Sequence, residues 1–331
     1  MQVDGIQAAP YHPDLAAGWD AVVDAAPGGT VLHSRRFLDY HGTRFRDLSL
    51  VGTRDGGAIS MVFPLAADPR DPELAVSHPG SSFGGIVGLS REPVHHRAFL
   101  KACAHWLHDQ GFRRLLYRLT PAPLLRQPDD GLLPTLLRLG RVAQLDLWSV
   151  LRLDADLPKQ TYWRTEIRKA ERKGLRADPV EAPQDWADLH AVVSARLARK
   201  YGRTMVHSVA ELIDLHDRLG PQSRGLLIRA PSGEVLAALW FIDYGTGTLH
   251  NQYIGTSDQG LDLRAATYGL SVALEGACTE GFRQFSFGRS TLADGWSENS
   301  DLVRFKSRFG AGLASQFHIE LSLDRLLESG L

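Results

Sequence analysis

The alternation of hydrophobic and polar positions predicts a mixed α/β arrangement in the first 153 residues. Apolar residues at helical spacing predict helices, and short apolar runs bounded by turn residues predict strands. The predicted helices cover 14–26, 35–41, 91–110 and 131–139, and the predicted strands cover 47–54, 58–65, 113–119 and 145–153. Asp55-Gly56-Gly57 is typical of a hairpin turn between the first two strands.

Residues 154–331 repeat this order of elements. Helices are predicted at 158–173, 185–200, 209–219 and 263–280, and strands at 224–230, 235–244, 248–254, 284–288 and 316–322. The first three of these strands follow one another through short glycine-containing turns, so we expect them to be antiparallel. The shared order, without any repeat at the level of residues, predicts two domains, 1–153 and 154–331. Each should hold a mixed, mostly antiparallel sheet flanked by helices.

Length, composition and net charge limit the classes of protein to which this chain can belong. A chain of 331 residues with 44% hydrophobic residues suits two well-cored domains. The net charge of -1 gives no global attraction to nucleic acid, so DNA is not expected and any RNA partner needs a local basic patch. The sequence has neither a signal-like start nor a membrane-length apolar run, which predicts a cytoplasmic protein without a membrane span.

Cysteine and histidine usage indicates neither a disulfide framework nor a metal site. Cys103 and Cys278 each lie in a helix-like, alanine-flanked run, which is typical of core thiols. The histidines of the first half have no third ligand at a useful spacing, so no metal is expected. These histidines are His33, His41, His95 and His96.

One lysine lies between two aromatic residues in the stretch Phe305-Lys306-Ser307-Arg308-Phe309-Gly310. Two interpretations stay open. An isolated pattern of this kind is usually an edge strand with a solvated lysine. Alternatively, Lys306 is a fixed positive charge beside a reacting carbonyl, in surroundings that Phe305 and Phe309 keep dry.

A second stretch, residues 159–176, carries seven basic residues against two acidic ones. Trp163, Ile167 and Ala170 form an apolar stripe at helical spacing. The stretch is either a solvated helix whose glutamates pair locally or a phosphate-binding ridge. The residues predicted to bind phosphate or tRNA in the second case are Arg164, Arg168, Lys169 and Arg172.

Together, these stretches resemble the FemABX aminoacyltransferases and related FemAB-like acyltransferases of the GNAT superfamily. Residues 164–174 look like the family's R-x-x-I-R-K-A-x-K-x-G helix, and Phe305-Lys306-x-x-Phe309-Gly310 looks like its F-K-x-x-F-G. The small-residue loop at 78–85 is similar to one in the family's first domain. Three antiparallel strands followed by a helix and a strand also match the GNAT core, so the resemblance implies tandem GNAT-like domains over nearly the full chain.

The resemblance implies transfer of an aminoacyl group from aminoacyl-tRNA to an amine of a small metabolite or cell-wall precursor, forming an amide. Aminoacyl-tRNA would be a co-substrate, with no bound cofactor. Lys306 falls on the position that steadies the oxyanion. Because no Ser-His-Asp or Cys-His arrangement is evident, we expect direct transfer without a covalent enzyme intermediate.

Other candidate site residues come from loops and strand ends near these stretches. Tyr253 is the preferred partner in catalysis, with Asp301 and His250 as further candidates for proton transfer, although an aromatic residue on a strand is more often part of the core. The predicted substrate-binding residues are Phe305, Asn251, Gln252, Arg289, Ser290, Tyr268, Ser81, Ser82 and Tyr201. A strand-entry bulge at 77–85, a basic helix end at 199–203 and a β-turn at 287–290 are the structural alternatives.

Two other functions stay open. The first is an N-acyltransferase that uses acyl-CoA or an acyl carrier protein. Residues 256–264, which would bind the pyrophosphate of coenzyme A, contain one glycine and two aspartates and lack the Q/R-x-x-G-x-G/A turn. The second is a non-catalytic binding module, which has no need of the Phe305-Lys306 pair. The transferred group, the acceptor, the oligomeric state and the general base stay open.

Overall fold

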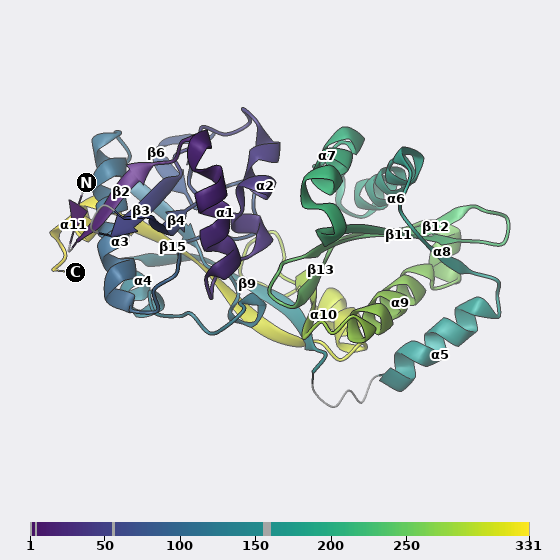
Figure 1. The fold of residues 1–331 in the computed structure, drawn as a ribbon. Helices are drawn as coiled ribbons and strands as arrows, with labels where there is room; N and C mark the ends of the chain where they lie inside the picture. Colours follow the sequence, from purple (N-terminus) through teal and green to yellow (C-terminus); the bar gives the residue numbers. More distant parts are fainter. Residues whose placement is uncertain (1, 4, 55–56, 155–159, 331) are drawn as a thin grey trace. The chain divides into compact units, whose positions relative to one another are not determined.

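The computed structural model describes residues 2–3, 5–54, 57–154 and 160–330. The chain divides into two compact units (Figure 1). Unit 1 comprises 1–147, 291–297 and 314–331, and unit 2 comprises 148–290 and 298–313. Compared with the sequence-based division at 153/154, unit 2 begins earlier and the last 18 residues group with the N-terminal unit. No helix among the described residues has the length and apolar character needed to cross a membrane.

Unit 1 contains a five-stranded sheet of antiparallel neighbours in the order β1-β2-β3-β4-β7. Its strands are β1 Gln2–Val3, β2 Ile6–Pro10, β3 Leu50–Arg54, β4 Ile59–Phe63 and β7 Val87–Gly88. The predicted pairing of β3 with β4 is confirmed, although both strands are shorter than predicted. Asp55 and Gly56 of the predicted turn lie outside the described residues. The sequence analysis missed β2, whose alternation is hidden by small alanine side chains.

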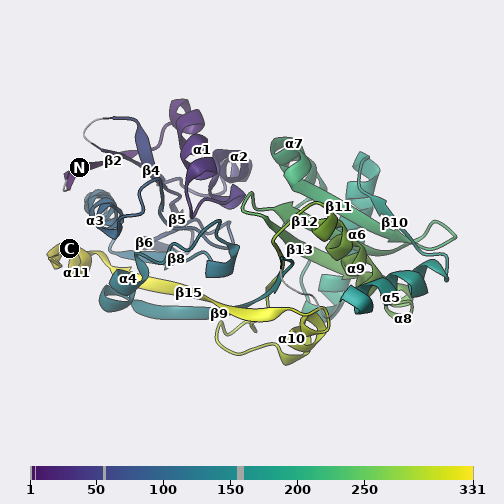
Figure 2. The same cartoon turned by 60° about the horizontal axis from the view of Figure 1, so that its bottom comes forward.

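A second group of strands in unit 1 brings the C-terminus back to the N-terminal half (Figure 2). Residues 318–322 of β15 pair antiparallel with β8, and β8 pairs parallel with β6. The strands are β5 Ala66–Asp68, β6 Asp71–Val76, β8 Arg114–Arg118 and β15 Gly312–Ser322. The sequence analysis missed β5 and β6, because the charged residues and prolines between 68 and 73 are typical of a loop.

The helices of unit 1 pack against these strands around one apolar core. Ser34 accepts a hydrogen bond from the Phe37 backbone nitrogen and so caps the start of α2. Cys103 is a buried free thiol of α3. The α-helices are α1 Ala16–Ala25, α2 Arg35–Leu38, α3 Pro93–Asp109, α4 Leu133–Leu139 and α11 Leu323–Glu328. The 3-10 helices are η1 Pro13–Leu15, η2 Val31–His33, η3 Asp39–His41 and η4 Ala122–Leu124.

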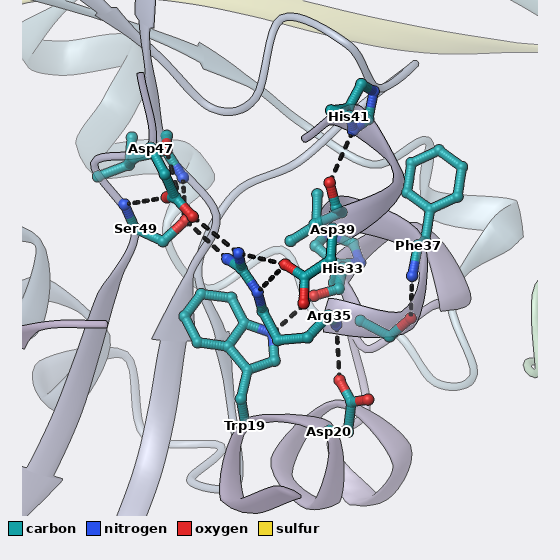
Figure 3. Close-up of polar contacts among 12 residues, drawn as sticks. Trp19, Asp20, His33, Arg35, Phe37, Asp39, His41, Asp47 and Ser49 are labelled. Atoms are coloured by element: carbon teal, nitrogen blue, oxygen red, sulfur yellow. Dashed lines mark hydrogen bonds and ion pairs between the residues drawn. The ribbon is translucent and has the colours of Figure 1, made fainter. Parts of the chain in front are cut away.

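A buried arginine connects the first helices of unit 1 to the segment that precedes β3 (Figure 3). The guanidinium of Arg35 donates to Asp39 Oδ1 at 2.9 Å, Asp47 Oδ2 at 2.7 Å and Ser49 Oγ at 3.3 Å. It lies 3.8 Å from the ring centroid of Tyr11. Because the guanidinium is paired and hydrogen-bonded on several sides, Arg35 is a structural residue of this unit.

Unit 2 contains the strand order β10-β11-β12-β13-β14, and β14 then pairs antiparallel with residues 148–152 of β9. The predicted antiparallel run of β11, β12 and β13 is confirmed, and β13 pairs parallel with β14. The strands are β9 Arg141–Arg152, β10 Arg176–Pro179, β11 Ser223–Arg229, β12 Val235–Asp243, β13 Thr248–Thr256 and β14 Gln284–Arg289.

Helices cover both faces of the unit 2 sheet (Figure 1). Helices α6 and α7 lie on one face, and α9 lies on the other with α5 packed beside it. The 3-10 helix η5 Gly220–Gln222 follows α7. The α-helices are α5 Gln160–Glu171, α6 Pro183–Tyr201, α7 Val209–Leu219, α8 Asp258–Asp262, α9 Ala265–Thr279 and α10 Ser300–Ser307.

The helix predicted at 263–280 is confirmed as α9, which begins two residues later and ends one residue earlier than predicted. The short helix α8 before it was not predicted, and Arg264 between the two adopts the left-handed conformation at φ 59°. The edge strand considered at Lys306 is the last turn of α10. The predicted helix at 158–173 is confirmed from Gln160 onward, whereas Pro158 and Lys159 lie outside the described residues.

Candidate functional site

The two parallel strands at the centre of unit 2 separate part-way along their length. The pairing of β13 with β14 covers three residue pairs and ends at His250 and Ser286. β13 continues to Thr256 and β14 to Arg289, so the sheet splits beyond these pairs. On its other side, β13 has a register shift that leaves Gln252 as an extra residue facing β12. The bulge in β13 and the separation of β13 from β14 together direct the side chains of these strands away from the regular sheet.

Lys306 reaches this split from α10. Its Nζ donates to the carbonyl oxygens of Gly288 at 3.0 Å and Arg289 at 2.8 Å, and to Ser290 Oγ at 2.9 Å. Lys306 is 5% exposed, so the solvated lysine considered from the sequence is wrong. Burial, aided by the charge of Arg289, lowers the pKa of Lys306 to about 7. The three acceptors match the three hydrogens of an ammonium group.

A wider polar network surrounds this amine. Ser290 Oγ lies 2.8 Å from Ser149 Oγ on β9. The ring of His250 bonds Ser286 Oγ through Nδ1 and Gln252 Oε1 through Nε2, each at 3.0 Å. Burial lowers the pKa of His250 to about 3, so the ring is neutral at physiological pH. The sequence analysis missed Ser149 and Ser286, because single serines on strands carry no signal of their own.

The Ser290–Lys306 contact has the composition of a serine–lysine pair, in which a lysine activates a serine nucleophile. Ser290 is 0% exposed, however, and its hydroxyl already contacts Ser149. A nucleophile must reach the carbonyl that it attacks. This arrangement therefore favours a supporting role for Ser290 and a transfer without a covalent intermediate.

Tyr253 and Asn251 flank the bulge of β13. Asn251 Nδ2 donates to the Tyr253 carbonyl at 2.9 Å and to the Trp240 carbonyl at 3.3 Å, which fixes the irregular backbone. The Tyr253 ring stacks on Trp240 with centroids 5.9 Å apart and makes an edge contact with His207. Burial raises the pKa of Tyr253 to about 12, so its hydroxyl can donate a proton but is not a base at neutral pH.

A second feature of unit 2 is a basic cavity of about 280 Å³ between α5 and the start of α9. Glu166 is 5% exposed and bonds Lys169 at 3.1 Å and Arg264 at 2.9 Å. Four cations against one carboxylate give the cavity walls a formal charge of +3. The start of α9 has no side-chain cap. The lining residues are Glu166, Lys169, Ala170, Arg172, Lys173, Leu263, Arg264 and Tyr268.

The residues predicted to bind phosphate divide into two pairs. Lys169 and Arg172 line the basic cavity, together with the predicted Tyr268. Arg164 instead lies 3.6 Å from Glu275 of α9, and Arg168 is an exposed residue outside the cavity lining. The sequence analysis missed Arg264, because its position depends on the left-handed conformation between two helices.

An aromatic layer connects the cavity to the helix that carries Lys306. Arg264 Nη2 donates to Tyr162 Oη at 3.1 Å, and the Tyr162 ring lies 5.7 Å from Phe309. Phe309 packs in turn on Phe305, and its carbonyl accepts from Trp163 Nε1 at 3.3 Å. The basic cavity and the buried amine thus share packing contacts within one unit.

The segment at 256–264 uses its backbone nitrogens internally. Gly260 N bonds Ser257 Oγ, Leu261 N bonds the Ser257 carbonyl, and Arg264 N bonds the Leu261 carbonyl. Leu263 N bonds the Gln259 carbonyl in the same way. A pyrophosphate cradle needs several backbone N–H groups directed at the ligand, and these four are already engaged.

The remaining predicted residues lie apart from these two features. Tyr201 is the exposed last residue of α6, with the charges of Lys200 and Arg203 over its ring. Ser81 and Ser82 belong to unit 1, where the Ser82 carbonyl accepts from Gln316 Nε2. The structure therefore brings together Lys306, Ser290 and the Arg289 backbone, and separately Lys169, Arg172 and Tyr268.

Comparisons with known proteins agree with this fold. Residues 161–300 match the family model of the acetyltransferase (GNAT) domain. The predicted GNAT fold and the predicted resemblance to FemABX-like GNAT acyltransferases are confirmed. Most of the matched segment lies in unit 2.

Three solved structures resemble the whole chain. FemX superimposes with a TM-score of 0.68 at 11% identity, covering 94% of this chain and 96% of FemX. L-PGS from Bacillus licheniformis gives 0.61 at 13% identity, covering 97% and 94%. A tandem GNAT protein from the clavulanic acid biosynthesis pathway, solved without AcCoA, gives 0.54 at 12% identity, covering 96% and 100%. No curated protein sequence matches the chain.

Proposed function

We propose that this protein is a FemABX-type aminoacyltransferase that moves an aminoacyl group from aminoacyl-tRNA to an amine of a small metabolite or cell-wall precursor. It would act in the cytoplasm, where charged tRNA is made. The observation that carries the proposal is the buried Lys306 ammonium at the strand split of a GNAT domain. The likeness to FemX over 94% of the chain supports it.

In the proposed reaction, the neutral acceptor amine attacks the ester carbonyl of the donor. A carbon–nitrogen bond forms, and the carbonyl oxygen takes up negative charge. The carbon–oxygen bond to the ribose then breaks, the new amide nitrogen loses a proton, and the ribose oxygen gains one. The Lys306 charge stabilises the oxyanion, an effect worth about 3 kcal/mol for a single well-aimed donor. Tyr253 is our candidate donor of the proton to the leaving oxygen.

The basic cavity gives the donor a place to bind. Four cations and an uncapped helix start attract phosphate groups. The formal charge of +3 on the cavity walls supplies locally the positive charge that the chain, with a net charge of -1, lacks overall. The cavity holds separate side-chain cations, which suits the spaced phosphates of an RNA 3′ end. The engaged backbone of 256–264 makes a coenzyme A pyrophosphate the poorer fit.

An acyl-CoA donor is the second candidate. The likeness to the tandem GNAT protein favours it, because the AcCoA that was left out of that structure is an acyl-CoA. A binding module without activity is the third candidate. Burying a lysine is unfavourable, and a binding surface without catalytic activity does not require it. A binding module therefore explains the burial of Lys306 least well.

The salt dependence of RNA binding tests the donor. Binding of a charged tRNA pool is measured against salt concentration for the wild type and two double variants. Lys169→Gln/Arg172→Gln alters the cavity, whereas Arg164→Gln/Arg168→Gln alters the same helix outside it. We expect the cavity variant to flatten the slope of log K against log salt by about 0.7 for each lost phosphate contact, with the control close to wild type. Equal slopes for all three proteins, or a flat response of the wild type, would contradict an RNA donor.

A further inference from the structure

Unit 1 contains a small hollow that the proposed reaction does not use. It has a volume of about 50 Å³. That is room for a group of a few atoms. One wall is apolar and includes Ile86, Leu125 and Leu132, whereas His33, His96 and Asp129 contribute polar groups. The hollow thus combines an apolar wall with a small number of polar atoms, which is the usual composition of a ligand-binding site.

The first histidine of this hollow is fully engaged by the protein. His33 Nδ1 lies 2.9 Å from Thr30 Oγ1 and also accepts from the Thr30 backbone nitrogen at 3.3 Å. The ring makes a further hydrogen bond to the backbone of Gly84. His33 is therefore a structural residue of the wall.

The second histidine has an unused nitrogen. His96 is 3% exposed, and its Nε2 has no hydrogen-bond partner among the described residues. The other ring nitrogen is engaged by a hydrogen bond to the backbone of Ser90. Burial lowers the pKa of His96, so the ring is neutral and Nε2 presents a lone pair. A buried acceptor without a donor is costly, which makes this atom a marker for a missing partner.

A carboxylate shares the hollow with this nitrogen. Asp129 is half-buried and interacts electrostatically with His96 and Arg91, but in the described part of the chain its carboxylate forms no ion pair or hydrogen bond. Glycines give both side chains their space. A Cβ at Gly28 would lie 3.0 Å from Asp129 Oδ2, and a Cβ at Gly88 would lie 2.8 Å from His96 Nε2.

We propose that this hollow binds a small ammonium group, such as a primary amine, which donates hydrogen bonds to His96 Nε2 and the Asp129 carboxylate. The neighbouring Asp130 adds negative charge to the lining and disfavours anions. The short alkyl part of the ligand would contact the leucine wall. No group of three or more metal-ligating side chains occurs among the described residues, so an organic cation fits the hollow better than a metal ion. The proposal rests on unit 1 alone and does not depend on the donor chemistry of unit 2.

Ligand-induced shifts of histidine signals test this site in the full chain. The protein is labelled at its histidine rings, and the His96 signal is assigned as the one that disappears in His96→Gln. Ethylammonium is the probe, with ethanol as the neutral isostere and acetate as the anion. We expect a saturable shift of His96 with ethylammonium only. With a few non-hydrogen atoms in the ligand, the Kd should be about 1 mM at the tightest.

Matched variants separate binding from folding. Asp129→Asn should abolish the shift, whereas Asp109→Asn, at the far end of the helix that carries His96, should retain it. The His33 signal should stay unchanged in both variants, because its partners are internal, and it reports that the wall is intact. Equal shifts with ethanol and ethylammonium would show that the hollow takes any small polar molecule. That result, the absence of a saturable shift, or wild-type binding by Asp129→Asn would each overturn the proposal.

Discussion

At the scale of single residues, the account depends on an amine held out of water by three acceptors. Burying an ammonium group is unfavourable unless its hydrogens are bonded, and all three hydrogens of Lys306 have partners within 3.0 Å. To contact an oxyanion, Nζ must exchange one of these partners or act as a nearby charge. The structure predicts that Lys306→Met lowers stability, because the variant removes the donor that these three acceptors share.

Lys306→Met should reduce both turnover and stability. We expect turnover to fall about 100- to 1,000-fold, as for loss of a single oxyanion donor. The free energy of unfolding should fall by about 1–3 kcal/mol because buried acceptors lose their donor. Steady-state rates and urea unfolding measure the two effects. Lys101→Met, which removes one hydrogen bond to the Ser329 carbonyl in unit 1, serves as the control with wild-type turnover. Wild-type turnover in Lys306→Met would remove the lysine from the mechanism.

The depressed pKa of Lys306 predicts a basic limb in the pH profile. If the charged form is required, kcat should fall as pH rises through about 7, where the buried amine loses its proton. The unfolded chain holds that proton up to its ordinary value of 10.5, so the Lys306 contribution to stability should rise between about pH 7 and 10.5. Rates measured from pH 5.5 to 9 check the limb, and a kcat that is constant above pH 6 would contradict it.

The Arg35 cluster predicts a stability effect that depends on pH. Burial raises the pKa of Asp47, but the Arg35 charge and the hydrogen bonds from Ser49 outweigh it and lower the pKa below its ordinary value of 3.8. Asp47 therefore stabilises the fold above pH 3.8, and this contribution is lost as pH falls through the lower, folded-state pKa. Asp47→Asn should cost about 1 kcal/mol at pH 7, a modest figure because Asp47 is 44% exposed. Urea unfolding at pH 7 and pH 3 should show the difference shrinking in acid; an equal difference at both would refute the pairing.

Residue patterns predicted part of the candidate site. The aromatic–lysine–aromatic pattern located Lys306, and the basic helix located Lys169 and Arg172. Arg264, Ser149 and Ser286 could not be predicted in this way. Their roles depend on which distant backbone lies opposite them, and a single sequence does not contain that information.

At the scale of elements, close backbone approach fixes the helices on the unit 2 sheet. A Cβ at Gly255 of β13 would lie 2.5 Å from the Cα of Val193 in α6. A Cβ at Gly276 of α9 would meet nothing nearer than 4.0 Å. Close packing against α6 therefore requires glycine at position 255, whereas the packing around position 276 leaves room for a larger side chain.

Alanine at these positions should have opposite effects. Gly255→Ala should destabilise the protein by about 1–3 kcal/mol, because α6 must shift away from the sheet. Gly276→Ala should stabilise it by about 0.5–1 kcal/mol, because alanine is the better helix former. Urea unfolding of both variants checks the signs, and stabilisation by Gly255→Ala would show that the sheet and α6 are not in close contact there.

Element types were easier to predict than their boundaries. The antiparallel run of β11 to β13 has strong apolar runs and glycine turns, so it was predicted within two residues at each end. Helix α8 was not predicted because its five residues contain a single large apolar side chain, Leu261. Helix α10 was missed because its N-cap, Asn299, follows a loop rich in polar residues.

At the scale of the whole molecule, the chain is a tandem fold whose C-terminus returns to its first unit. Residues 314–331 belong to unit 1, where β15 pairs with β8. Local periodicity predicted a strand at 316–322, but the partner of that strand lies about 200 residues away in sequence. Pairing over such a separation is a tertiary property, which explains why the sequence indicated two consecutive domains.

The nature of the donor is the central claim, and one transfer assay tests it most directly. The protein is incubated with a pool of tRNA charged with labelled amino acids, with labelled acetyl-CoA in parallel, and with a mixture of small amines as acceptors. Each reaction is repeated after treatment with RNase. The account predicts labelled amide product from charged tRNA that RNase abolishes, and loss of that product in Lys306→Met. Transfer from acetyl-CoA that is insensitive to RNase, with none from charged tRNA, would contradict it.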